Sequence, residues 1–232
     1  MSVFVISDLH LSLDGRKPMD IYGGPWVGHT GRVKERWMEL VGPADTVILS
    51  GDLSWGLRLS DAEADLRWIE ALPGTKVLVK GNHDLWWTSL TKLSQAFSGM
   101  HFLQNVSYEG ETFAIAGSRG WLCPGTEGFS ANDAKIYERE LLRLRLSLAD
   151  MERKDPQRTK LRIGAMHFPP TNERLEDSGF TELFEEYGVS KVVYGHLHGR
   201  EAYKNGLQGI KNGVEYILTS CDWLSCTPLL LL

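Results

Sequence analysis

Aspartate, histidine and asparagine residues recur in this sequence directly after short apolar runs. The runs span residues 3–7, 46–50, 76–80, 161–166 and 191–194. The polar residues that follow them are Asp8, His10, Asp52, Asn82, His83, Asp84, His167, His196 and His198. A capped loop would explain any one of these segments. The chain has seven histidines, however, and five of them belong to this set, so solvated loops are a poor explanation for the whole pattern.

Metal binding is the chemistry that these residue types favour. Carboxylate, imidazole and amide groups without thiolates suit hard to borderline divalent ions, here Mn, Fe, Zn, Ni or Co. Even seven ligands from this set are too many for one ion and suit two ions about 3.5–4 Å apart, as in phosphatases and nucleases. One carboxylate would bridge the ions. A hydroxide shared by them would be the nucleophile, because metal binding lowers the pKa of water toward neutrality.

The apolar runs read as buried strands that alternate with helices in the first half of the chain. Helices are expected over residues 32–41, 60–72 and 88–97, with Ser60 as the N-cap of the second. This alternation is typical of an α/β fold, in which ligands collect at the carboxyl ends of the strands. The polar residues named above follow those ends.

Residues 100–117 change character and indicate a second, partly antiparallel sheet. Short strands are expected over 101–104, 106–109 and 112–117, with a hairpin turn at 109–110. The longest helix is expected over 133–154. Further strands are expected over 202–204 and 216–219, around a turn at Asn212-Gly213.

Composition is that of a globular protein with one domain over residues 1–232. The net charge is −5, so nucleic acid is an unlikely partner, and no apolar stretch approaches the ~20 residues that span a membrane. The three cysteines match no zinc motif or disulfide framework. The first residues lack the basic region of a signal peptide. We therefore expect a cytoplasmic protein that does not contact membranes.

As an ordered set, the polar segments resemble the five motifs of the calcineurin-like metallophosphoesterase superfamily. The matching segments are Asp8-x-His10, Gly51-Asp52, Gly81-Asn82-His83-Asp84, His167 and Gly195-His196-x-His198. They span nearly the whole chain in the order of the family. The resemblance implies an α/β fold built as a four-layer sandwich of two facing mixed β-sheets flanked by helices.

The resemblance also implies a role for each residue of the motifs. Asp8, His10 and His198 would hold one metal ion. Asn82, His167 and His196 would hold the other, and Asp52 would bridge the two. His83 would bind neither ion and would protonate the leaving oxygen of the phosphoester, and Asp84 would orient its imidazole.

Departures from the family pattern bear on the substrate. Protein phosphatases of this superfamily carry an arginine in the second motif. The corresponding segment here, Gly51-Asp52-Leu53-Ser54-Trp55-Gly56, has no arginine. The chain looks closer to bacterial phosphohydrolases and phosphodiesterases. Arg119 is the candidate replacement for the lost cation, with a surface salt bridge as the alternative.

Tryptophans are frequent near the motif turns, and they could form an aromatic wall for a substrate. With Arg119, the candidate substrate contacts are Trp55, Trp86 and Trp121, and packing beneath the loops is the alternative for each. We expect a small-molecule phosphoester substrate, with nucleotides among the candidates. A nuclease of the same superfamily and a non-catalytic scaffold with the same fold are the alternatives.

Overall fold

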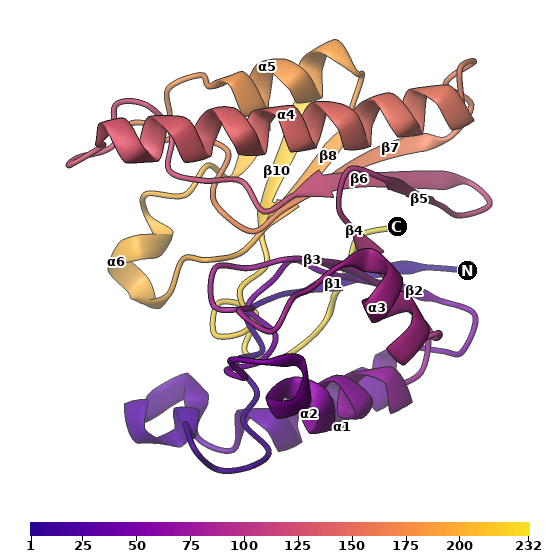
Figure 1. Ribbon diagram of the computed structural model, residues 1–232, viewed down its shortest axis with the longest axis vertical. Coiled ribbons are helices and arrows are strands. Elements are labelled where there is room, and N and C mark those ends of the chain that lie inside the picture. The colour runs from indigo at the N-terminus through magenta and orange to yellow at the C-terminus, as the bar shows by residue number, and fades with distance from the viewer. The chain divides into compact units, whose positions relative to one another are not determined.

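The computed structural model describes residues 1–232, which form two compact units (Figure 1). The first unit comprises residues 1–102 and 219–232, and the second comprises residues 103–218. Each unit has its own β-sheet and its own hydrophobic core. The expectation that residues 1–232 act as one domain stays a prediction.

The first unit is built on a five-stranded sheet in the order β11-β1-β2-β3-β4. Its strands are β1 (Val3–Ile6), β2 (Thr46–Leu49), β3 (Thr75–Val79), β4 (Met100–Leu103) and β11 (Leu229–Leu230). Strands β1, β2 and β3 pair in parallel, so their carboxyl ends share one edge. The apolar tail of the chain supplies β11, which pairs antiparallel with β1.

Three α-helices and two short 3₁₀ helices complete the first unit. They are α1 (His29–Leu40), α2 (Leu59–Ala71), α3 (Leu90–Ala96), η1 (Met19–Tyr22) and η2 (Gly24–Trp26). Val33, Trp37, Leu66 and Leu93 join the helices to one core with the sheet. Helix α2 begins just before Ser60, and its N-cap is Arg58 rather than the predicted Ser60.

The second unit is built on a six-stranded sheet in the order β5-β6-β7-β8-β10-β9. Its strands are β5 (Ser107–Glu109), β6 (Phe113–Ser118), β7 (Leu161–Met166), β8 (Lys191–Tyr194), β9 (Gly209–Lys211) and β10 (Val214–Leu218). Strands β6, β7, β8 and β10 run parallel, and β5 and β9 are antiparallel edges. The predicted turn at 212–213 joins β9 to β10.

Helices α4 (Ala131–Lys154) and α5 (Gly179–Glu186) lie together over one face of this second sheet (Figure 1). Ser130 caps α4 in a capping box with Asp133. The strand predicted over 202–204 is wrong, because these residues belong to helix α6 (Gly199–Tyr203) and its C-cap. No helix of either unit combines the length and apolar character needed to cross a membrane.

The architecture is therefore an α/β fold with two mixed sheets and associated helices, as predicted. The parallel order of β1, β2 and β3 gathers the first three motif turns at one edge of the first sheet. In the second unit, β6, β7 and β8 likewise place Arg119, His167 and His196 after neighbouring strand ends.

Candidate active site

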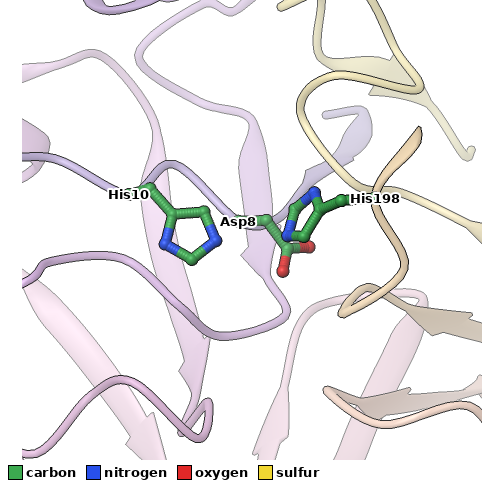
Figure 2. A group of neighbouring side chains, drawn as sticks. All are labelled: Asp8, His10 and His198. Atoms are coloured by element: carbon green, nitrogen blue, oxygen red, sulfur yellow. The ribbon is translucent and has the colours of Figure 1, made fainter. Parts of the chain in front are cut away.

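Asp8 and His10 follow β1 and form the first group of candidate ligands. Figure 2 draws their side chains on this segment, and it also draws His198 on the loop after β8. Asp8 and His10 are buried and offer ligand atoms within 4.8 Å of each other. Their φ angles are 57° and 44°. Non-glycine residues adopt such left-handed backbone only where the surroundings enforce it, and functional sites are where this strain concentrates.

Asp52 lies beside this segment because backbone hydrogen bonds join the two turns. The amide of Asp8 donates to the Gly51 carbonyl at 2.9 Å, and the amide of His10 donates to the Asp52 carbonyl at 2.9 Å. Asp52 is buried and also has a left-handed φ, of 53°. Its Oδ2 lies 3.9 Å from His10 Nε2, and one of its oxygens lies within 4.8 Å of a ligand atom of Asp8.

The third motif turn, residues 81–84, is in close contact with Asp52. A β-carbon on Gly81 would lie 2.1 Å from Asp52 Oδ1, so only glycine fits. The amide of His83 donates to Asp52 Oδ1 at 2.8 Å. Asn82, predicted to bind the second metal ion, follows directly and is half-buried. The contacts of Gly81 and His83 fix this turn against the proposed bridging carboxylate.

Asp84 is fully buried and serves as a hub for these turns. Its carboxylate accepts hydrogen bonds from the amides of Asp52, Leu53 and Gly81 at 2.7–2.9 Å and, less closely, from the amide of Ser54. The indole N–H of Trp86 donates to it at 3.0 Å. These contacts give Asp84 a structural role that sequence reasoning missed. The predicted orientation of the His83 imidazole by Asp84 stays a prediction.

The His83 side chain is exposed and packs against Trp55. The ring centroids of His83 and Trp55 are 4.5 Å apart, and Trp55 also stacks on His10 at 4.6 Å. Trp55 thus contacts both the predicted general acid and a predicted metal ligand, whose rings are themselves 5.7 Å apart. An exposed imidazole beside candidate metal ligands can transfer a proton to a bound substrate.

The second unit supplies a second group of histidines. His167 follows β7 and is fully buried, and His196 follows β8 with a φ of 72°. His196 Nδ1 lies 3.3 Å from His167 Nε2, and the two rings are nearly perpendicular. The Gly195 amide donates to the His167 carbonyl at 3.1 Å and ties the two turns together. His198 takes the N-cap position of α6.

Arg119 and Trp121, two predicted substrate contacts, form a structural pair in the second unit. Arg119 Nη2 lies 3.2 Å from the fully buried Glu140 carboxylate, and its guanidinium lies over the Trp121 ring at 4.6 Å. The Trp121 indole N–H donates to Asp133 at 3.0 Å. For Arg119 the alternative to a substrate contact was a surface salt bridge. The ion pair with Glu140 favours a salt bridge, but this one is mostly buried.

Two further aromatic side chains, those of Trp86 and His29, are buried. Trp86 is only 2% exposed, and this burial favours core packing over the predicted substrate contact. His29, the first residue of α1, is also buried. One of its ring nitrogens is 2.9 Å from the Leu9 carbonyl oxygen, between the two ligands of the first motif.

Residues 1–200 match the family model of the calcineurin-like phosphoesterases. The chain belongs to this family. It also shares 36% identity over 83 residues with the Gene 66 protein of Mycobacterium phage D29, a stretch that covers 36% of this chain and 40% of the phage protein. The chain thus matches less than half of that relative's length.

Solved structures of this fold include proteins from three bacteria. The phosphopantetheinyl hydrolase of Mycobacterium tuberculosis aligns over 100% of this chain and 95% of its own, with a TM-score of 0.56 and 17% identity. Protein AQ665 of Aquifex aeolicus, of unknown function, aligns over 99% and 95% with a TM-score of 0.52 and 16% identity. Protein TT1561 of Thermus thermophilus aligns over 85% and 82% with a TM-score of 0.56 and 14% identity. At these identities the likeness establishes the fold alone.

Proposed function

We propose that this phosphoesterase-family chain is a hydrolase that uses two divalent metal ions to cleave a phosphomonoester or phosphodiester. The observation that carries the proposal is the group of oxygen and nitrogen donors at the strand ends. In the first unit, Asp8, His10 and Asp52 are buried on left-handed backbone with ligand atoms close together. Strained backbone and buried carboxylates are destabilising on their own, and a bound metal ion would offset that free-energy cost.

The donor set fits two transition-metal ions. We assign Asp8, His10 and His198 to one ion, Asn82, His167 and His196 to the other, and Asp52 to both, on the basis of family membership. The facing nitrogens of His167 and His196 support the second group, because a shared ion would satisfy both. Two bound ions would supply charge neutralisation for the phosphate and a water of lowered pKa. We name Mn, Fe, Zn, Ni and Co as candidates, since the donors do not select among them.

We assign the proton transfer to His83. Its amide is fixed by Asp52, and its exposed imidazole rests on Trp55, so a substrate can reach the ring while the backbone stays in place. His83 would donate a proton to the leaving oxygen. Asp84 would act on this turn through the hydrogen bonds that its carboxylate accepts from backbone amides.

For the substrate we propose a small phosphoester, with nucleotides among the candidates, over nucleic acid or phosphoprotein. The net charge of −5 disfavours a polyanion. The second-motif arginine of protein phosphatases is absent, and the ion pair of Arg119 with Glu140 makes Arg119 a weak replacement. The phosphopantetheinyl hydrolase shows that a hydrolase uses this fold, but it does not identify the substrate of this chain.

An activity assay on reloaded protein tests the proposal. Chelated protein should be inactive and should regain hydrolysis of an aryl or nucleotide phosphodiester with Mn²⁺, with little activity on phosphoserine peptides.

His83→Ala should lose about 10²–10⁴-fold in kcat, and less on a 4-nitrophenyl ester, whose leaving group needs less protonation. His101→Ala, an exposed histidine on β4, is the matched control.

Each alternative function predicts a different outcome of this assay. A scaffold would show no metal-dependent turnover on any ester. A nuclease would cleave single-stranded nucleic acid faster than the small diesters. An equal loss on good and poor leaving groups would remove His83 from the acid role.

A further inference from the structure

A cavity of about 310 Å³ opens beside His83 within the first unit. Its wall includes Trp55, Leu57 and Leu85 as well as His83, and the loop after the first motif contributes Arg16 and Lys17. Leu57 and Leu85 are 66% and 60% exposed, which is high for large apolar side chains. At this volume the cavity is at the small end of the range for ligand pockets. The cavity can therefore hold one ring or a group of similar size.

Lys17 differs from the other charged groups around this cavity. Its Nζ lies 3.1 Å from the centre of the Trp55 ring, and no carboxylate forms a salt bridge with it. Arg16, by contrast, pairs with Asp14 at 3.1 Å. Lys17 is thus the cation that is available to a ligand.

The carboxylates on the cavity wall already have protein donors. Asp61 accepts from the Arg58 amide at the start of α2. Asp65 is buried and accepts from the Leu13 amide and the Ser54 hydroxyl, and burial raises its pKa. These contacts leave the Lys17 ammonium without a competing carboxylate partner.

Resting on the proposed function, we propose that this cavity receives the leaving group of the substrate, and that this group joins an apolar or planar part to a second anionic group. The leaving oxygen would face His83. The apolar part would pack on Leu57 and Leu85, and the anionic group would pair with Lys17. The substrate class is therefore a phosphoester of an anionic alcohol, in which a carboxylate or a further phosphate provides the second charge.

Two product mimics of similar shape, one anionic and one neutral, test this assignment. Metal-free protein is titrated with 4-hydroxyphenylacetate and with 4-hydroxyphenylacetamide, and binding is followed by ligand-observed NMR. We expect about tenfold tighter binding of the carboxylate, since hydrogen bonds to charged groups are the stronger ones. Lys17→Met keeps the aliphatic stem and should bring the ratio of the two affinities near one. Lys34→Met, on the exposed side of α1, should leave the ratio unchanged.

The matching methyl phosphodiesters of the two phenols separate this proposal from the proposed function. Wild-type protein loaded with Mn²⁺ should prefer the acidic ester in kcat/KM, and Lys17→Met should bring the ratio of the two kcat/KM values near one. Turnover of both esters without a charge preference would overturn the leaving-group assignment but would still support the proposed hydrolase activity. Equal binding of the two phenols by the metal-free protein would overturn it whether or not either ester is cleaved.

Discussion

Gly81 lies at a close approach between two of the motif turns. Its missing side chain leaves room for the Asp52 carboxylate, which the His83 amide then holds in place. The identity of this residue therefore controls the position of the proposed bridging ligand. This close contact gives a physical reason for the glycine at the start of the third motif.

Gly81→Ala should move Asp52 and weaken metal binding. The new methyl group must displace a carboxylate and a backbone amide, both of which are held in place, so we expect about 1–3 kcal/mol of lost stability together with lost metal. Urea unfolding and metal analysis of the purified variant measure the two effects. Gly31→Ala is the control, because Gly31 lies inside α1 with open space around it and should gain about 0.5–1 kcal/mol. Retention of full metal content by Gly81→Ala would contradict the account.

At the scale of elements, Asp84 joins the turns after β2 and β3. Four backbone amides and one indole donate to its buried carboxylate. An amide side chain has only one acceptor oxygen, so substitution leaves buried donors unsatisfied. The turns therefore depend on a fully buried charge.

Asp84→Asn should lose about 2–4 kcal/mol of stability and also bind metal more weakly, because the donors belong to the turns that carry Asp52 and Asn82. Urea unfolding with and without Mn²⁺ gives both quantities. The control is Asp20→Asn, because the Asp20 carboxylate accepts one exposed hydrogen bond, from the Gly28 amide. Comparable losses of stability and metal binding in the two variants would show that the hydrogen bonds to Asp84 contribute little to either.

Local signals predicted most elements, and their failures have physical reasons. The capping residues and apolar spacing of α4 are read from neighbours in sequence, and the prediction over 133–154 nearly matches Ala131–Lys154. Helix α6 has only five residues, too few for a helical period to show, so a strand was predicted there. Strand β11 forms through pairing with β1 at the other end of the chain, and no local pattern encodes such a contact.

At the scale of the whole molecule, the motif order predicted the family and the fold, since each motif follows a strand. The predicted ligands of each unit lie where parallel strands end. Contacts between side chains far apart in sequence could not be predicted in this way. Arg119 was a candidate substrate contact because it could replace the missing arginine of the second motif. Its buried partner Glu140 lies 21 residues away in sequence, so the ion pair could not be predicted, and the contact of Lys17 with Trp55 was likewise missed.

The count of bound metal ions per chain, in wild-type protein and in Asp52→Asn, tests the central claim most directly. Protein purified without chelator and dialysed against Mn²⁺ is analysed by mass spectrometry of the metal and by amino-acid analysis of the chain. We predict up to two ions per chain in the wild type and a loss at both sites in Asp52→Asn, because Asp52 would bridge the ions. Two ions retained in Asp52→Asn, or none in the wild type, would contradict the account.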